Sequence, residues 1–164
     1  MCGHRVNFKE RMMEQLLQQK SILISSLNND GCPEISYAPF VKHQDKIYLY
    51  LSRAAKHYDN LSLNQQCSVM AIEDEELAQN IFARNRVSFQ CESKKIESVE
   101  QTIETLFEQR HGDKMLAMFK KMDFDWFELT IEKGRLVKGF GQAFDIMKEK
   151  SELKLIPVMS IGHK

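Results

Sequence analysis

The sequence predicts an α+β protein, mainly β, built on a small antiparallel β-barrel with helices packed on its outside. Three observations predict this fold class. Six or seven segments read as strands, because their residues are apolar or alternate between apolar and polar. Most of them are joined by short turns of the hairpin type, and three or four helical stretches lie between them. Antiparallel strands joined in this way curl into a barrel and leave the helices outside.

The first third of the chain supplies one helix and three strands. Asn7 and Glu10 have the spacing of a capping box, and apolar residues then recur at helical spacing, which predicts a helix over 8–19. Asparagine, aspartate and glycine at 28–31 separate two apolar runs and predict a hairpin. The third strand is apolar or aromatic on both faces, so we expect it to be buried on both sides or to line an interface. The expected strands are 21–27, 33–41 and 46–52.

Helices and strands alternate through the rest of the chain. Residues 96–110 have the clearest helical stripe, and Asp74 is expected to cap a helix that runs to Phe82. The turn EKG at 132–134 is expected to join the two strands of a closing hairpin. The expected helices are 54–64, 74–82, 96–110 and 114–122. The expected strands are 67–73, 83–91, 125–131 and 135–144, and residues 147–164 read as a C-terminal loop.

Composition indicates a single globular domain over 1–164, with a flexible start at 1–6. The chain has 164 residues, 43% of them hydrophobic, which is enough for a sizeable core. Lysine plus arginine and aspartate plus glutamate both number 23, so nucleic acid is not an expected partner, and near-zero net charge favours an oligomer. Residues 1–20 do not resemble a signal peptide and no apolar stretch is long enough to span a bilayer, so we expect a cytoplasmic protein with no membrane partner.

The cysteines and the standard motifs point to no common catalytic or metal site. No two cysteines form a CxxC pair, so we expect free thiols in a reducing compartment. The chain has no G-x-S-x-G elbow, Walker loop, HExxH motif or dinucleotide-binding glycine fingerprint. The four cysteines are Cys2, Cys32, Cys67 and Cys91.

Two glycines and a late histidine are the most informative features. Gly139 and Gly141 lie inside a run that reads as a strand, where glycine is unfavourable unless a bulge, a bend or a closely approaching ligand needs the space. The sequence ends in Gly162-His163-Lys164, and the neutral imidazole of His163 can bind a metal or a heme iron. The alternative for His163 is an ordinary solvated histidine.

Three charged residues could support such a site. Asp125 falls on the presumed inward face of its strand, where a carboxylate needs a partner; it either reaches water or a turn amide, or accepts a hydrogen bond from a ligating imidazole. Arg84 and Arg86 share the polar face of their strand. They are either solvated or salt-bridged, or they hold a carboxylate, a phosphate or an oxygen species.

The segment LSRAAKHYDNL (51–61) gathers polar side chains where a strand gives way to a helix. Backbone amides and cations at such a junction suit an anion, although an ordinary polar helix start reads the same way. The residues concerned are Ser52, Arg53, Lys56, His57 and Asn60.

The segment SRAAKHYDNL (52–61) resembles the phosphate-binding segment of the FMN-binding split-barrel superfamily, to which the pyridoxamine-phosphate oxidases belong. More narrowly, four segments resemble the heme-degrading split-barrel proteins of the HutZ and HugZ type, and the likeness runs from about residue 8 to the end. These segments are ISYAPFV (35–41), MAIEDEELAQNIFARNRVSF (70–89), DFDWFELTIEKGRLVKGFGQAF (123–144) and IGHK (161–164).

This resemblance implies a six-stranded antiparallel split barrel that forms a homodimer with heme at the interface. The axial ligand of the heme iron matches His163, the acidic residue that tunes it matches Asp125, and the distal arginine matches Arg86 in preference to Arg84. His57 is expected to be peripheral. Heme is then both cofactor and substrate: an external reductant and dioxygen open the porphyrin, and iron is released.

Two further expectations are our own inferences, beyond what the resemblance implies. Gly139 and Gly141 would let the flat macrocycle approach the backbone closely, and residues 150–164 should be poorly ordered or displaced without heme. Two other functions remain open. A flavin enzyme of the pyridoxamine-phosphate oxidase type would bind the FMN phosphate with Ser52, Arg53, Lys56 and Asn60, whereas a heme carrier would bind heme without degrading it.

Overall fold

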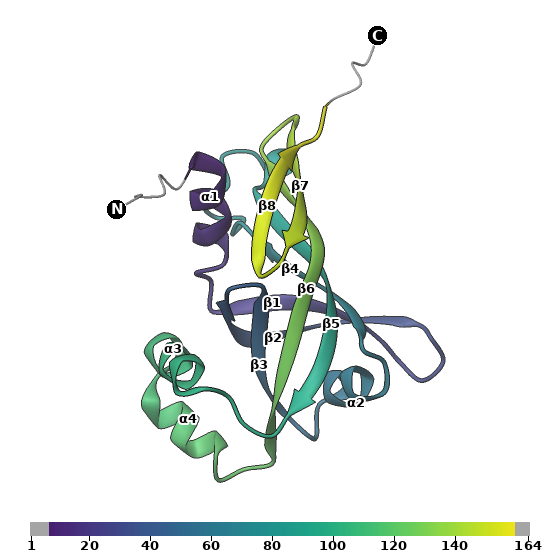
Figure 1. The fold of residues 1–164 in the computed structure, drawn as a ribbon, viewed down its shortest axis with the longest axis vertical. Helices are drawn as coiled ribbons and strands as arrows, with labels where there is room; N and C mark the ends of the chain where they lie inside the picture. The colour runs from purple at the N-terminus through teal and green to yellow at the C-terminus, as the bar shows by residue number, and fades with distance from the viewer. Residues whose placement is uncertain (1–6, 160–164) are drawn as a thin grey trace.

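One antiparallel sheet of eight strands forms the body of the molecule in the computed structural model, which describes residues 7–159 (Figure 1). The strand order is β3-β2-β1-β4-β5-β6-β7-β8, and β3 also pairs with β6. This extra pairing closes six strands into a barrel, as predicted, and leaves β7 and β8 as an additional hairpin. The strands are β1 Ser21–Leu27, β2 Pro33–His43, β3 Lys46–Ser52, β4 Gln66–Ile72, β5 Arg86–Ile96, β6 Phe124–Lys138, β7 Gln142–Glu149 and β8 Glu152–Pro157.

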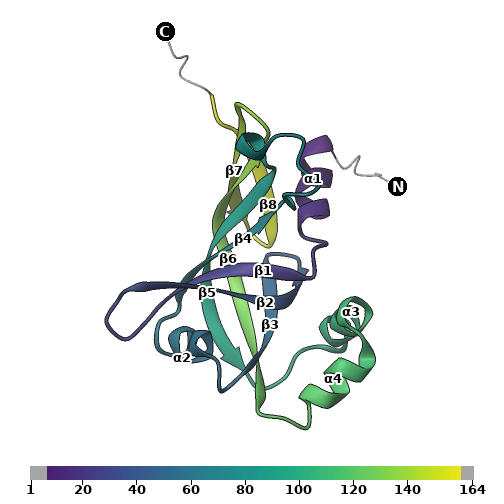
Figure 2. The ribbon, with the colours of Figure 1, turned by 180° about the vertical axis from the view of Figure 1, so that it is seen from behind.

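The helices lie outside the barrel, as expected. Figures 1 and 2 show α3 and α4 toward the end where β6 begins, and α1 toward the end that carries β7 and β8. The capping box at the start of α1 is present: the Asn7 side chain accepts a hydrogen bond from the Glu10 amide at 3.0 Å, and the Glu10 carboxylate accepts one from the Asn7 amide at 3.0 Å. The α-helices are α1 Phe8–Leu16, α2 Lys56–Leu63, α3 Gln101–His111 and α4 Asp113–Phe119.

Strand β3 is buried on both of its faces, as the sequence predicts. One face, with Leu49, points into the apolar interior of the barrel. The other face packs against α3 and α4, where Tyr50 stacks on Trp126 at 4.4 Å between ring centroids and meets the edge of Phe107. Two cores therefore share β3 and hold the helical pair against the barrel.

Two predicted elements differ from the structure. The helix expected over 74–82 is wrong: a turn at Asp74 is followed by a short 3-10 helix, η1 Ile81–Ala83. Its residues are mostly exposed, so no packing supports a longer helix. The helix expected from residue 96 begins at Gln101, because β5 continues to Ile96 in pairing with β6.

The predicted turn at 132–134 is also wrong, because β6 runs without a break through Gly134. Pairing with β5 on one side, and with β3 and then β7 on the other, holds the strand extended. A Cβ on Gly134 would meet the Ser88 carbonyl oxygen and would lie 2.7 Å from the ring of Phe89. Glycine is therefore required at position 134, because the backbone of β5 and the Phe89 ring approach β6 too closely for a Cβ atom.

Gly139 and Gly141 lie in the turn between β6 and β7, so their predicted place inside a strand is wrong. Their φ angles of 52° and 74° are left-handed, and a Cβ on either would meet nothing within 4 Å. The geometry of the turn accounts for both glycines without an approaching ligand.

The C-terminal loop predicted over 147–164 is wrong for residues 147–157, and so is the poor order expected for residues 150–157; a displacement of this segment in the absence of heme stays a prediction. Here β7 continues to Glu149 and β8 forms Glu152–Pro157, with Leu153 and Leu155 packed partly against the barrel core. Residues 1–6 and 160–164, with the predicted ligand His163, lie outside the described residues.

Candidate functional site

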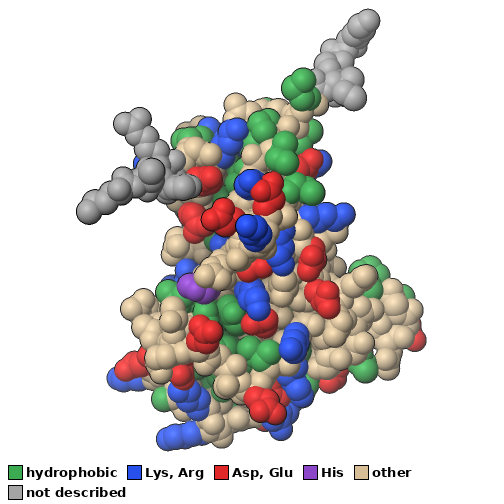
Figure 3. Space-filling model, viewed as in Figure 1, with side chains coloured by type: hydrophobic (Ala, Val, Ile, Leu, Met, Phe, Trp, Pro, Cys, Tyr) green, Lys and Arg blue, Asp and Glu red, His purple; other side chains and the backbone are tan. Residues whose placement is uncertain are grey.

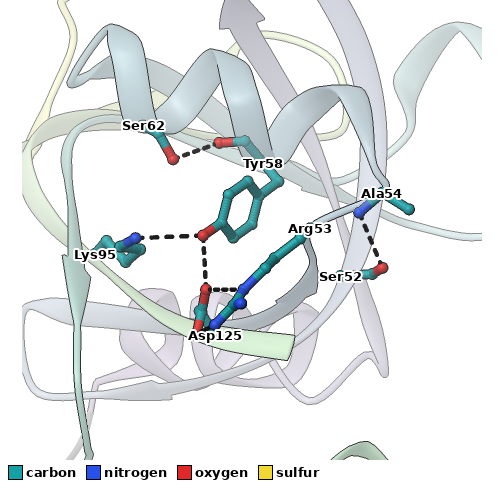
Figure 4. A network of polar contacts seen from close by, with 7 residues as sticks. All are labelled: Ser52, Arg53, Ala54, Tyr58, Ser62, Lys95 and Asp125. Carbon is teal, nitrogen blue, oxygen red and sulfur yellow. Dashed lines mark hydrogen bonds and ion pairs between the residues drawn. The ribbon is translucent and has the colours of Figure 1, made fainter. Parts of the chain in front are cut away.

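Asp125 lies at the start of β6 in a network of polar side chains (Figure 4). Arg53 follows the end of β3, and the pairing of β3 with β6 places it beside this carboxylate. Arg53 donates from Nε to Asp125 Oδ2 at 2.9 Å and from Nη2 to Oδ1 at 3.1 Å. Tyr58 on α2 donates its hydroxyl hydrogen to Oδ2 at 2.6 Å, and Lys95 on β5 donates to the Tyr58 oxygen at 3.3 Å.

This network keeps Asp125 ionised. The hydrogen bonds from Arg53 and then from Tyr58 lower the pKa of Asp125 to about 2. The side chain is 22% exposed, and Oδ1 accepts only the bond from Arg53 among the described residues. A carboxylate oxygen has a second lone pair, so Asp125 can accept a further hydrogen bond from an outside donor such as an imidazole N–H.

The polar residues at the start of α2 are largely engaged with neighbouring side chains. Asn60 is buried and donates to Ser26 Oγ at 3.1 Å and to Glu34 Oε2 at 2.9 Å. Hydrogen bonds from Asn60 and Asn28 lower the pKa of Glu34, and the charge of Lys56 contributes less. Asn60, one of the expected anion-binding residues, is therefore bound to a carboxylate of the protein itself.

Ser52 and His57 also have partners within the protein. Ser52 Oγ accepts a hydrogen bond from the Ala54 amide at 3.2 Å. His57 Nδ1 lies 3.0 Å from Ser36 Oγ, and burial lowers the pKa of this imidazole. Of the five residues predicted to bind an anion at this junction, Arg53 is the one that the fold brings to Asp125, and His57 takes no part in the Asp125 network.

The two candidate arginines are held differently. Arg84 is tied to the adjoining loop: its Nε donates to the Glu73 carbonyl at 2.8 Å and its Nη1 to Glu75 at 3.2 Å. Arg86 begins β5 and makes one long bond, 3.4 Å, to the Arg84 carbonyl. Among the described residues Arg86 has no carboxylate partner, so its guanidinium keeps donors available.

Asp125 and the turn with Gly139 and Gly141 lie at opposite ends of β6 (Figure 1). Arg86 belongs to the turn end, because it pairs with Val137 two residues before Gly139. The predicted site residues therefore form two groups in one protomer. They are Asp125 with Arg53 at one end, and Arg86 with the two glycines at the other.

Sequence reasoning missed Tyr58 and Lys95. Tyr58 reaches Asp125 from a helix 67 positions earlier in the chain, and only the folded barrel brings the two together. Its place in the polar segment 51–61 was the available signal.

Cysteines and acidic residues supply no metal site in the described part of the chain. Cys67 and Cys91 are buried free thiols, and burial raises the pKa of Cys67 to about 12. Within residues 7–159, no cluster of three or more histidine, cysteine, aspartate or glutamate side chains could hold a metal ion. No helix in that range is long and apolar enough to cross a membrane.

Comparison with known proteins places this geometry among split barrels. The family model for pyridoxamine 5'-phosphate oxidase matches residues 8–138. A protein of Vibrio cholerae serotype O1 named heme oxygenase HutZ is 34% identical over 132 residues, which are 79% of this chain and 75% of that protein.

Solved structures agree with the sequence comparison. Campylobacter jejuni ChuZ superposes with a TM-score of 0.77 at 31% identity; the match covers 92% of this chain and 63% of the ChuZ chain. The structure of HutZ, named as the heme storage protein from Vibrio cholerae, superposes with a TM-score of 0.70 at 33% identity. This match covers 80% of this chain and 96% of the HutZ chain. A heme binding protein of Mycobacterium smegmatis, at 17% identity, shares the fold with a TM-score of 0.73 over 87% of this chain and 59% of its own.

Proposed function

The chain belongs to the pyridoxamine 5'-phosphate oxidase family of split barrels, and within that family we propose that it binds heme and opens the porphyrin with dioxygen and an external electron donor, releasing iron. The observation that carries this proposal is the 34% identity, over 79% of the chain, to a protein named heme oxygenase HutZ. In this proposal His163 binds the heme iron, Asp125 supports His163, and Arg86 acts near the opposite face of the heme.

The reach of the chain supports a homodimer. Pro157 of β8 pairs with Phe144 of β7, which pairs with Leu136 of β6. Leu136 is 11 residues from Asp125, or about 36 Å along an extended strand. His163 is six residues beyond Pro157, and six fully extended residues span at most about 22 Å.

The strand path between Asp125 and Leu136 is therefore longer than the chain that follows Pro157. This favours a site in which the His163 and the Asp125 of one heme come from two copies of the chain, in the homodimer with heme at its interface that the sequence resemblance implies. Each of its two sites would take His163 and Arg86 from one protomer and Asp125 from the partner.

The side chains suit these roles. When bound, heme supplies the redox centre and is also the molecule that is opened. An ionised Asp125 can accept the N–H of the ligating imidazole of His163, which fixes its tautomer and makes it a stronger electron donor. Arg86 is always charged and keeps free donors, so it can stabilise negative charge that develops as dioxygen accepts electrons.

The contacts at α2 favour heme over FMN. An FMN phosphate would need Arg53, Lys56 and Asn60 free to donate. Arg53 instead forms a bidentate ion pair with Asp125. Asn60 donates hydrogen bonds to Glu34 and Ser26. A phosphate would have to displace two carboxylates of the protein, so this segment is a poor anion site.

Titration of the purified protein with hemin and, separately, with FMN tests the cofactor assignment. We expect a Soret band that saturates at one hemin per protomer, is lost in His163→Ala, and is kept in His43→Ala, a histidine in β2 used as the control. Binding of FMN with no Soret band would overturn the assignment and leave the flavin enzyme. A Soret band that survives in His163→Ala would overturn the choice of ligand.

A further inference from the structure

Large apolar side chains lie together on the outer surface of the barrel, where β2, β1 and β4 run side by side. Tyr37 on β2 is the partner of Leu23 on β1, and Leu23 is in turn the partner of Met70 on β4. Ile35 lies two residues before Tyr37, on the same face of β2. Ile35 is 80% exposed, Tyr37 67% and Leu23 38%. We call Leu23, Ile35, Tyr37 and Met70 the outer patch, and such a group indicates a contact surface.

The alternation of side chains along the strands directs the outer patch away from the core. On β1, Ile22 and Ile24 are buried in the barrel core, so Leu23 between them points to the opposite side. On β2, Ala38 is buried next to Tyr37. In the described part of the chain, Leu23 and Tyr37 belong to neither of the two cores. The outer patch is therefore a sheet surface left open to a partner.

The outer patch lies in a region without charge. Charged residues make up 28% of the chain, yet two rows of paired outward positions across β2, β1, β4 and β5 contain none. A surface that stays in water usually has about 25–35% charged residues, whereas the centre of a protein interface loses them. The two rows are Tyr37, Leu23, Met70 and Ser88, and Ile35, Ser25, Ser68 and Gln90.

The β1–β2 hairpin extends this region beyond the barrel. Figures 1 and 2 both show the tip of the hairpin projecting from the body of the molecule. Residues 21–33 include one charged residue, Asp30. In Figure 3, which has the view of Figure 1, the projecting tip is mostly tan and green. Glu34 begins the other arm of the hairpin, and its carboxylate accepts a hydrogen bond from Asn60 of α2, on the face away from the outer patch.

A second copy of the chain fits the outer patch better than a different protein does. In a dimer with twofold symmetry the same surface meets itself, so like charges near its centre would repel one another. An uncharged patch avoids this repulsion. A different protein is commonly selected through complementary charge, and the outer patch offers none. Tyrosine and methionine, here Tyr37 and Met70, are also enriched in the centres of interfaces.

The outer patch borders a residue of the proposed heme site. Ile72 follows Met70 by two residues on the same face of β4, and it pairs with Arg86 on β5. A copy of the chain seated on the outer patch would therefore lie next to Arg86. A heme shared by two protomers would lie at such a border.

We propose that the outer patch is the surface through which two copies of the chain pack together, with Arg86 at the border of their interface. This inference rests on the proposed function, which calls for a homodimer but does not say which surface forms it.

Sedimentation velocity over a range of protein concentrations tests the outer patch with variants. We expect a dimeric wild type. Ile35→Glu would bury an unpaired carboxylate from each protomer, so the dimer dissociation constant should rise about 100-fold or more. Tyr37→Ser adds no charge and should raise it about tenfold or more. Met118→Glu is the matched control, because Met118 is 45% exposed on α4, and it should leave the dissociation constant unchanged.

Hydroxyl-radical footprinting of the wild type gives a second measurement that needs no variant. Labelling of Tyr37 should be lower in the concentrated dimer than in the diluted monomer, whereas labelling of Met118 should be equal in both. A dimer in which Tyr37 gains no protection, or in which Ile35→Glu associates as strongly as Met118→Glu, would overturn the outer patch and leave the homodimer standing. A wild type that is monomeric at every concentration would overturn both, while the hemin titration decides heme binding separately.

Discussion

A mixed dimer tests whether each site takes Asp125 from one protomer and His163 from the other. The two variants are Asp125→Asn, which keeps the shape of the side chain and removes its charge, and His163→Ala. Chain lengths favour this proposed arrangement, because about 36 Å of β6 lies between Asp125 and Leu136, whereas the six residues from Pro157 to His163 span at most about 22 Å.

Each variant alone should be impaired. His163→Ala should not bind hemin through iron, and Asp125→Asn should open the ring about 10- to 100-fold more slowly, the usual cost of losing the partner of a ligating imidazole. In a heterodimer of the two, one site receives His163 from the Asp125→Asn protomer and Asp125 from the His163→Ala protomer. That site is intact, so the heterodimer should show about half of the wild-type activity.

The assay needs heterodimers purified through two different affinity tags, loaded with hemin and reduced in air. Sites built within one protomer would give about half of the Asp125→Asn rate, because no site would hold both native residues. That low rate would refute the reasoning from chain reach. Equal mixtures of the two homodimers, kept unexchanged, are the control.

Three other predictions concern stability and the choice of arginine. Gly134→Ala should destabilise the protein by about 1–3 kcal/mol, because its methyl group meets the Ser88 carbonyl; an unchanged urea midpoint would contradict the tight packing. The pKa of Asp125 is lowered to about 2 by folding, so its stabilising effect is present above about pH 4 and is lost as the pH falls toward 2. In Asp125→Asn the free energy of unfolding should therefore fall less steeply between about pH 4 and pH 2, by at most about 2 kcal/mol relative to the wild type. The same pH dependence in variant and wild type would count against the ion pair. Arg86→Gln should slow ring opening without lowering the thermal midpoint, whereas Arg84→Gln should lower the midpoint because it frees the loop at 73–75; the reverse pattern would exchange their roles.

Local chemistry made the first part of the fold predictable. The capping box at Asn7 and the hairpin turn at 28–31 act through neighbouring residues, and both formed as expected. The turn at 132–134 and the helix over 74–82 were wrong for the opposite reason. Pairing with strands distant in sequence keeps β6 extended through Gly134, and the 74–82 segment lacks a surface to pack against.

The sequence predicted several residues of the candidate site, but it did not predict which of them contact one another. The rule that an inward carboxylate needs a partner pointed to Asp125, but the partner is Arg53, which the sequence had suggested for a phosphate. Tyr58 was missed, because its contact with Asp125 spans 67 positions along the chain and only its place in the polar segment 51–61 signalled it. The separation of Asp125 at the start of β6 from the β6–β7 turn is a property of the folded barrel, and it is the basis for the proposal of a site shared by two protomers.

The most direct test of the proposed function is a single-turnover reaction. The protein, loaded with one equivalent of hemin, is mixed with ascorbate in air while the Soret band and chelatable ferrous iron are followed together. We predict that the Soret band disappears and that iron appears in a ratio of about one per heme lost, with no change under nitrogen. A Soret band that stays constant in air with ascorbate would contradict ring opening and would make this protein a heme carrier.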